Sequence, residues 1–295
     1  MSTSTRTPDQ TLPGATPGRL RRFLRTEPLA ATAAAYLLLI VLAAIFAPLL
    51  APHDPNVQSL MQRLKPFSGE HPLGTDDFGR DVLSRLIYGT RVTLQASAVA
   101  VGVSVAIGVP TGLVAGYRRG WLDALLSRIF DGLMSIPGLI LALTIVAVLG
   151  PGLTNAMAAV GLIFAPQFFR VTRAATSEVM GETYIESSLS IGCTPLRVVS
   201  KHVLPNVVPA ILVQVSVALG VAVSAEASLS FLGLGVEAPT SSWGAMLSTA
   251  VQTMTIAPNM VWIPGLMIFS VVLAFTLLGE GLRRTLVSTG RNNDD

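Results

Sequence analysis

The side chains best suited to metal chemistry lie in the polar segment 53–91, which separates two long apolar runs. His71 is followed within ten residues by three carboxylates, and divalent metals accept both imidazole nitrogens and carboxylate oxygens as ligands. A metal site also needs ligands that converge in a fixed number, and nothing in this spacing sets that number. A glycine turn followed by a helix, with arginines paired to the carboxylates, explains the same residues more simply, so we expect no metal site. The residues are Asp76, Asp77 and Asp81, the glycines Gly74 and Gly79, and the arginines Arg80 and Arg85.

Residues that could hydrolyse a nucleotide or act as a catalytic nucleophile are scarce. Neither of the two lysines, Lys65 and Lys201, follows a glycine, and the chain contains no G-x-x-x-x-G-K-[ST] phosphate-binding loop. The single cysteine, Cys193, excludes an intrachain disulfide and a cysteine-rich metal site, and beside a glycine it is typical of a small spacer. We therefore expect this chain to be no enzyme and to bind no cofactor itself.

The composition indicates a protein that crosses a membrane several times. Hydrophobic residues make up 51% of the 295 residues and charged residues only 13%, whereas soluble domains carry roughly 25% charged residues. The net charge of +3 could suggest a nucleic-acid partner. The arginines flank the apolar runs instead of forming a patch, which argues against nucleic acid and in favour of membrane spans.

Six uncharged runs are candidate membrane spans, given a rise of about 1.5 Å per residue and a hydrocarbon core of roughly 30 Å. The runs are residues 29–50, 92–117, 132–150, 155–169, 203–225 and 261–279. The first could instead be a cleaved signal peptide, but its length and the polytopic chain that follows favour an uncleaved span. Residues 121–131 have a helical apolar period and are expected to begin the third span, and the short fourth span is expected to extend past Arg170. Pro110 predicts a kink in the second span.

Basic residues cluster at four places beside these runs, and six spans put all four on one side of the membrane. The clusters are the tail 1–27, Arg118 with Arg119, Arg170 with Arg173, and Arg283, Arg284 and Arg291. The positive-inside rule makes that side the cytoplasm, so both tails, 1–27 and 286–295, are predicted to be cytoplasmic. His53 and His71 then lie across the membrane from His202, which excludes a catalytic arrangement built from these three histidines.

The stretch 183–209 is a polar island between apolar runs, and it falls on the predicted cytoplasmic side. It is too charged to lie in lipid. Thr183 and Glu186 have the spacing of a capping box, in which each side chain satisfies a free backbone N–H at the start of a helix. Gly192 can end that helix, because glycine adopts the left-handed conformation without steric cost.

A second short helix is predicted directly after this glycine. Thr194 can cap it, and Pro195 suits its first position, where a missing N–H costs nothing. Pro205 is expected to end it before the next apolar run. The island therefore reads as a helix–bend–helix unit that presents a rigid surface outside the bilayer.

The same residues resemble a known motif. The chain reads Glu-Ser-Ser at 186–188, glycine at 192 and His-Val-Leu-Pro at 202–205. This pattern resembles the EAA loop of ABC-importer permease subunits, above all the second permease of dipeptide, oligopeptide and nickel importers. Serines replace both alanines and His202 stands where many families have isoleucine, yet serine is small enough to preserve close packing. The resemblance implies a loop, at about 171–205, that couples to a separate ATPase through Glu186, Ser187, Ser188, Gly192, Leu204 and Pro205.

Two further stretches, 71–85 and 226–235, look like the same subfamily. The resemblance implies an all-α membrane protein with six transmembrane helices, a cytoplasmic helix-turn-helix coupling loop and a type I (MetI-like) permease core at 92–285. Residues 28–91 would be a first transmembrane helix and an external loop. The implied location is the bacterial inner membrane, in contact with lipid. The implied partners are a second permease in a heterodimer, two ATPase subunits that hold ATP and Mg²⁺, and an extracytoplasmic binding protein.

The implied substrates are dipeptides or oligopeptides, with nickel or another small solute as the alternative, and no substrate-binding residue can be named. A gradient-driven secondary transporter would need ionisable residues within its spans, which are nearly free of charge here. A scaffold that transports nothing is a further alternative. Glu226, at the edge of the fifth run, could be a functional carboxylate or could merely orient the loop that follows. Trp243 and Trp262 suit a headgroup boundary.

Three glycines recur every fourth residue on one face of the second span and are predicted to serve helix packing: Gly108, Gly112 and Gly116. Small residues at this period allow the backbone of a neighbouring helix to approach closely. The neighbour could belong to this chain or to a partner permease. In the isolated chain we expect this face to meet only lipid, which would make the chain unstable on its own.

Overall fold

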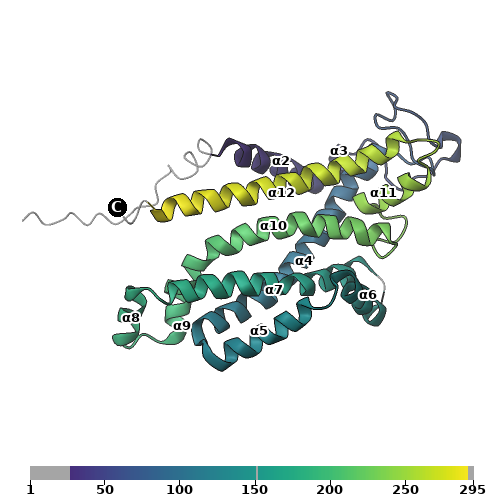
Figure 1. Ribbon diagram of the computed structural model, residues 1–295. Helices are drawn as coiled ribbons and strands as arrows, with labels where there is room; N and C mark the ends of the chain where they lie inside the picture. The colour runs from purple at the N-terminus through teal and green to yellow at the C-terminus, as the bar shows by residue number, and fades with distance from the viewer. Residues whose placement is uncertain (1–26, 151, 292–295) are drawn as a thin grey trace, which may run out of the picture.

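The computed structural model describes residues 27–150 and 152–291, and within these residues every regular element is helical (Figure 1). The elements, in chain order, are α2 (Pro28–Ile45), α3 (Ala47–Leu50), η1 (Leu60–Gln62), α4 (Val82–Arg118), α5 (Gly120–Met134), α6 (Gly138–Leu149), α7 (Leu153–Val179), α8 (Thr183–Ser190), α9 (Pro195–Val198), η2 (Val199–Val203), α10 (Leu204–Phe231), α11 (Trp243–Gln252) and α12 (Asn259–Arg291). The predicted all-α architecture is confirmed. Of the predicted tails 1–27 and 286–295, residues 1–26 and 292–295 lie outside the described residues, and residues 286–291 continue helix α12.

Four helices are long and apolar enough to cross a membrane, and the bent pair α5–α6 would make a fifth. The four are α2, α4, the continuous helix formed by α9, η2 and α10, and α12. Helix α7 does not reach that criterion, because Gln167, Arg170 and Arg173 lower its hydropathy. It is nevertheless the main neighbour of α4 and runs beside it in the bundle (Figure 1). Counting α7 gives the six helices expected from the sequence.

The third predicted span is not one straight helix. Residues 121–131 and 132–150 were expected to run on continuously, whereas α5 and α6 meet at an angle of 90°. The break falls at Ser135, Ile136 and Pro137, and Pro137 precedes the first residue of α6. Proline lacks an N–H and forces the residue before it out of the helical region, which accounts for the break. The apolar run spans this bend without any change in composition, so hydropathy alone did not reveal it.

The second span begins ten residues before its apolar run. Helix α4 starts at Val82, because the Asp81 side chain caps it by accepting a hydrogen bond from the Ser84 N–H at 2.8 Å. The turn before it is as predicted, with positive φ at Gly74 (+75°) and Gly79 (+72°). Pro110 lies inside α4 without ending it.

Helix α11 packs against the bundle. The predicted position of Trp243 at a headgroup boundary is therefore wrong. The Trp243 side chain is fully buried and its indole Nε1 donates a hydrogen bond to the Leu86 carbonyl at 3.2 Å. A buried indole needs such a partner for its N–H. Trp262 is 68% exposed, in keeping with a position at the bundle surface.

The two ends of the bundle differ in construction. Figure 1 shows α8 and α9 at one end, together with the start of α2 and the last turns of α12. Segment 51–81, α6 and α11 lie at the opposite end. The long helices α4, α10 and α12 run between these two ends.

Candidate functional site

Helix α8 forms the first arm of the polar island, and it begins differently from the prediction. Glu182 occupies the N-cap position without a side-chain hydrogen bond, and Thr183 is already the first helical residue. The capping box between Thr183 and Glu186 is therefore wrong. Glu186 lies in the first turn, where the positive end of the helix dipole stabilises its negative charge. Its side chain is exposed and available to a partner.

Gly192 forms the bend. Its φ is +84°, a left-handed conformation that residues with a Cβ rarely adopt. The Gly192 N–H bonds the Leu189 carbonyl at 3.0 Å and the Cys193 N–H bonds the Ser188 carbonyl at 3.1 Å. These two bonds make a Schellman motif, which satisfies the carbonyls at the end of α8. A Cβ on Gly192 would meet no atom within 4 Å, so conformation, not space, requires glycine here.

The second arm is continuous with the following membrane span. Thr194 occupies the predicted N-cap position, although its side chain makes no cap bond, and Pro195 is the first residue of α9. The helix then widens through the π-turn η2, where the Leu204 N–H bonds the Val199 carbonyl, and continues as α10. Pro205 therefore does not end a separate helix. The wider turn before it relieves the clash between a proline ring and the preceding carbonyls.

Buried side chains fix both arms to the bundle. Ile185 from α8, Val198 from α9 and Val203 from η2 are all fully buried, and they belong to the main hydrophobic cluster of the protein. Asn206 of α10 adds a polar link, donating to the Tyr184 hydroxyl at 3.3 Å. The unit is therefore rigidly joined to α10.

The serines of α8 present a small surface that needs no partner. Ser187, Ser188 and Ser190 each donate a hydrogen bond to the carbonyl four residues earlier, at 2.9, 2.8 and 2.9 Å. Their hydroxyls are thus satisfied within the helix. Another protein surface can approach this face closely without desolvating an unpaired hydroxyl.

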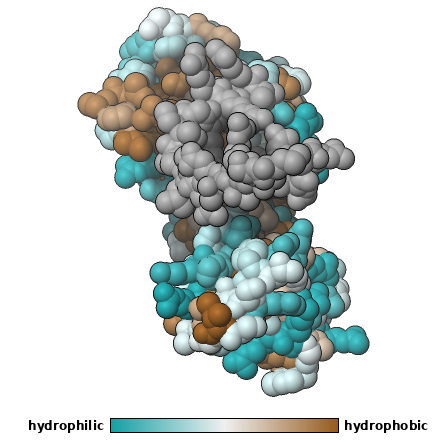
Figure 2. All heavy atoms as spheres, turned by 90° about the vertical axis from the view of Figure 1, so that its left-hand side faces the viewer, coloured by the Kyte–Doolittle hydropathy of each residue, from teal (hydrophilic) through white to brown (hydrophobic). Residues whose placement is uncertain are grey.

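Exposed apolar side chains stand at the tip of this unit, and the sequence reasoning missed them. Ile191 is 82% exposed and Leu196 is 80% exposed, one on each side of the glycine bend. Figure 2 views this end, where an otherwise hydrophilic surface below the grey atoms carries a compact apolar patch. Large apolar side chains that stand together on a polar surface are typical of an interaction site. Their position on either side of a predicted turn glycine was the available signal.

The glycine face of α4 packs against α7 of the same chain. A Cβ on Gly108 would lie 2.5 Å from the Ala165 carbonyl oxygen, and one on Gly112 would lie 2.7 Å from that of Phe169. A Cβ on Gly116 would lie 2.6 Å from the Thr176 Cβ. The neighbour is thus internal, and the expectation that this face meets only lipid in the isolated chain is wrong.

Glu226 lies inside α10, five residues before its end, and is fully buried. Its carboxylate accepts hydrogen bonds from the Ser230 hydroxyl at 2.6 Å and the Thr93 hydroxyl at 3.1 Å. The Ser242 hydroxyl, which caps α11, lies 3.4 Å from that of Ser230. Glu226 therefore joins α4 to α10, and through Ser230 it is linked to the start of α11.

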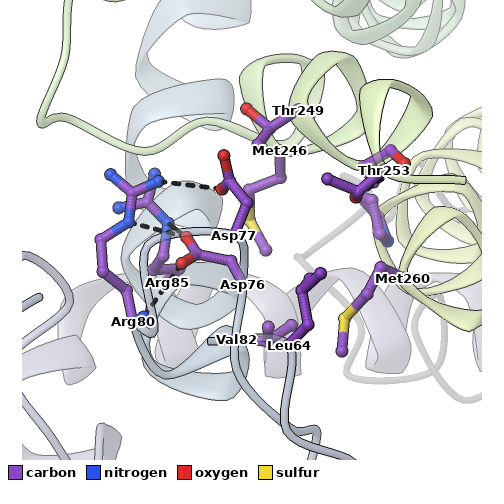
Figure 3. Close-up of a pocket in the computed structure, with 12 residues that line it drawn as sticks. Leu64, Asp76, Asp77, Arg80, Val82, Arg85, Met246, Thr249, Thr253 and Met260 are labelled. Atoms are coloured by element: carbon purple, nitrogen blue, oxygen red, sulfur yellow. Dashed lines mark hydrogen bonds and ion pairs between the residues drawn. The ribbon is translucent and has the colours of Figure 1, made fainter. Parts of the chain in front are cut away.

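The acidic residues near His71 form two separate groups. Asp76 accepts from Arg80 at 2.7 Å and lies 3.4 Å from Arg85, as the simpler interpretation predicted. These side chains line a small cavity of about 30 Å³ beside α11 (Figure 3). Burial, followed by the negative charge of Asp76, raises the pKa of Asp77 above its usual value. Asp81 belongs to the other group, with His71.

Comparison with known proteins places the chain in a family. The family described as "Binding-protein-dependent transport system inner membrane component" matches residues 108–288, and the "N-terminal TM domain of oligopeptide transport permease C" matches residues 18–66. The glutathione transport system permease protein GsiD of Pectobacterium atrosepticum is 42% identical over 267 residues, which cover 90% of this chain and 88% of that protein. The protein of the same name from Escherichia coli O157:H7 is 43% identical over the same shares.

A solved structure shares the fold. A chain of the inward-facing MetNI methionine ABC transporter superposes with a TM-score of 0.56 at 23% sequence identity, covering 68% of this chain and 96% of that one. At this identity the likeness concerns the fold alone. The family match covers more than half of the chain and agrees with the all-helical bundle. The chain therefore belongs to the binding-protein-dependent transport system inner membrane components and is a permease subunit of an ABC importer.

Proposed function

We propose that the unit from Thr183 to Pro205 is the coupling site, through which a separate ATPase subunit drives this permease. The observation that carries the proposal is the pair of exposed apolar side chains, Ile191 and Leu196, at the tip of a rigid polar unit. Glu186 and the self-satisfied serines Ser187 and Ser188 lie on the helix that leads to this tip. An ATPase groove with apolar pockets and a basic rim would complement this surface.

The route from this surface into the membrane is a single helix. Because α9 runs through η2 into α10, a displacement of the tip acts directly on α10, which packs against α4, α7 and α12. Gly192 sets the angle between the two arms, and Leu204 with Pro205 forms the start of α10 within this continuous helix. Packed interfaces have discrete arrangements, so a rigid-body displacement can exchange inward-open and outward-open packings of the bundle.

The energy source and the partners follow from the same proposal. The sequence contains no phosphate-binding loop, so ATP and Mg²⁺ would be bound by two ATPase subunits and no cofactor by this chain. A second permease would complete the pathway as a heterodimer, and an extracytoplasmic protein would deliver the substrate. The apolar helix surfaces would contact lipid of the bacterial inner membrane. The start of α2 and the last turns of α12 lie at the same end as the unit from Thr183 to Pro205 (Figure 1), which supports the proposal that both tails are cytoplasmic.

Small peptides are the proposed substrate class. The similar permeases are named for glutathione transport, and glutathione is a tripeptide, which supports dipeptides, glutathione or oligopeptides over other solutes. Nickel or another small solute is the alternative. Uptake of labelled dipeptides, glutathione and nickel in a deletion strain separates these: peptide uptake restored by the intact gene supports the proposal, and restoration of nickel uptake alone contradicts it.

The coupling proposal is tested by replacing Gly192 with valine. Because φ at Gly192 is +84°, a β-branched residue must change the angle between the arms although there is space for its side chain. We expect ATP hydrolysis by the assembled transporter to persist while uptake falls about tenfold. A change of this size lies within the range that typical coupling free energies produce. Gly102→Val is the matched control, since Gly102 lies in α4 with open space around it. Normal uptake by Gly192→Val at normal membrane levels would contradict the coupling role.

A further inference from the structure

Two histidines and one aspartate from separate parts of segment 51–81 converge at the end of the bundle opposite the coupling unit (Figure 1). The His71 Nδ1 lies 2.8 Å from Asp81 Oδ1, and the His53 Nδ1 lies 3.9 Å from the same oxygen. All three potential ligand atoms lie within 4.8 Å of one another. The two imidazole rings are neighbours as well, with centroids 4.9 Å apart.

We propose that His53, His71 and Asp81 form a binding site for a divalent transition metal, of which Zn²⁺ suits the donors best. Two imidazole nitrogens and one carboxylate oxygen, with water as a fourth ligand, make a tetrahedral zinc site. Calcium and magnesium prefer sites made entirely of oxygen, which this cluster does not offer. A bound cation would replace the hydrogen bond between His71 and Asp81.

Two of the three ligands are already fixed in position. The second oxygen of Asp81 accepts hydrogen bonds from the Ser84 N–H at 2.8 Å and the Ser84 hydroxyl at 2.7 Å, which leaves Oδ1 to face the histidines. The far nitrogen of His71, Nε2, lies 3.0 Å from Gln62 Oε1. A partner on the far nitrogen orients the near one, as outer-shell groups do in metal sites.

His53 is the ligand with the most freedom to move. Bonds of about 2.0–2.2 Å to a tetrahedral metal place ligand atoms roughly 3.3 Å apart. The His53–Asp81 distance of 3.9 Å must therefore shorten, and the His71–Asp81 distance of 2.8 Å must lengthen, each by roughly 0.5 Å. The His53 side chain is 38% exposed and can rotate, while its backbone N–H is held by the Ser84 hydroxyl at 3.0 Å. That exposure also gives a cation a path from solvent.

The set suggested by spacing in the sequence, His71 with Asp76, Asp77 and Asp81, lacks His53, the ligand that completes the converging group. Asp76 and Asp77 turn toward Arg80 instead, and His53 takes their place. A metal at this site would tie the segment that follows α3 to the first turn of α4. Because that segment has little regular structure, the expected consequence is higher stability of the outer end of the bundle.

The experiment uses the full chain, purified in detergent with a streptavidin-binding tag instead of a polyhistidine tag and freed of metal with a chelator. Zinc is titrated by calorimetry, and cobalt is added separately to observe its visible absorption. The chain has only three histidines and one cysteine, so few other donors compete. We expect one equivalent of zinc to bind, and cobalt to give the intense bands of a four-coordinate site. His53→Gln and His71→Gln should each weaken zinc binding by about tenfold or more.

His202→Gln is the matched control, because His202 lies in η2 at the other end of the molecule, and its zinc affinity should equal that of the wild type. His53→Gln is the more informative variant, since its backbone bond to Ser84 survives the change. Zinc should raise the thermal midpoint of the wild type and not that of His53→Gln. The proposal is overturned if excess cobalt gives no such bands, or if zinc binds His53→Gln and the wild type equally well. Either result would leave a hydrogen-bonded imidazole–carboxylate cluster without a metal.

Discussion

Glu226 concentrates several contacts on one buried carboxylate. Its oxygens accept hydrogen bonds from the Ser230 and Thr93 hydroxyls, and the Thr93 oxygen in turn accepts a hydrogen bond from the Trp243 backbone N–H at 3.3 Å. Glu226→Ala leaves these buried hydroxyls without an acceptor, and we expect a loss of about 1–3 kcal/mol in the free energy of unfolding. Glu226→Gln keeps one acceptor oxygen and should lose less. Thermal unfolding of the solubilised chain measures the stability of both variants, and Glu237→Gln, at an exposed position, is the control. Equal unfolding midpoints for Glu226→Ala and Glu237→Gln would contradict a stabilising role for Glu226.

Asp77 makes stability depend on pH. One of its carboxylate oxygens is buried without a hydrogen-bond partner, and burial together with Asp76 raises the pKa of Asp77. The folded chain then holds the proton more tightly than the unfolded chain, so stability is lost as the pH rises through the raised pKa. We expect Asp77→Asn to unfold at a higher temperature than the wild type at pH 7, with the difference narrowing as the pH falls. The exposed Glu70→Gln should show no such narrowing. A constant difference across the pH range would show that charge is not the cause.

At the scale of elements, the pairing of α4 with α7 depends on the absence of side chains. A Cβ on Gly112 would lie 2.7 Å from both the Phe169 oxygen and the Thr172 Cβ, so the two helices would have to separate. Overpacking of this kind costs about 1–3 kcal/mol. We expect Gly112→Ala to lower the thermal midpoint of the solubilised chain, whereas Gly102→Ala on the open face of the same helix should leave it unchanged or raise it. If both variants behave alike, close approach is not what holds α4 and α7 together.

Sequence pattern predicts the elements that are uniform along their length and misses their junctions. Apolar runs gave the spans, and the requirement of Gly192 for positive φ gave the bend, because each depends on local residue types. The break at Pro137 and the π-turn before Pro205 depend on how proline is accommodated by neighbouring helices, which no local pattern encodes. The pairing of His53 with His71 was missed for a related reason, since 17 residues with no regular element except the short η1 lie between them.

At the scale of the whole molecule, the two ends of the bundle carry different structures. Segment 51–81 and α11 close one end through buried polar contacts, such as that of Arg85 with the Pro55 carbonyl at 3.1 Å. The coupling unit projects from the other end on a helix that runs the length of the bundle. Substrate delivery and ATP hydrolysis would then act on opposite ends of α10. This division requires that the two ends lie on opposite sides of the membrane.

That requirement can be tested because the chain has a single cysteine. In a Cys193→Ser background, Ser190→Cys places one thiol on exposed α8, and Glu70→Cys places one on the exposed part of segment 51–81. A charged maleimide that cannot cross lipid should label Ser190→Cys only in inside-out vesicles and Glu70→Cys only in right-side-out vesicles. The prediction follows from the positive-inside distribution of arginines and from the positions of the two segments at opposite ends of the bundle. Labelling of both cysteines from the same side would be incompatible with a coupling unit that meets a cytoplasmic ATPase. Labelling of Ser190→Cys from outside alone would invert the topology and exclude that role for Thr183 to Pro205.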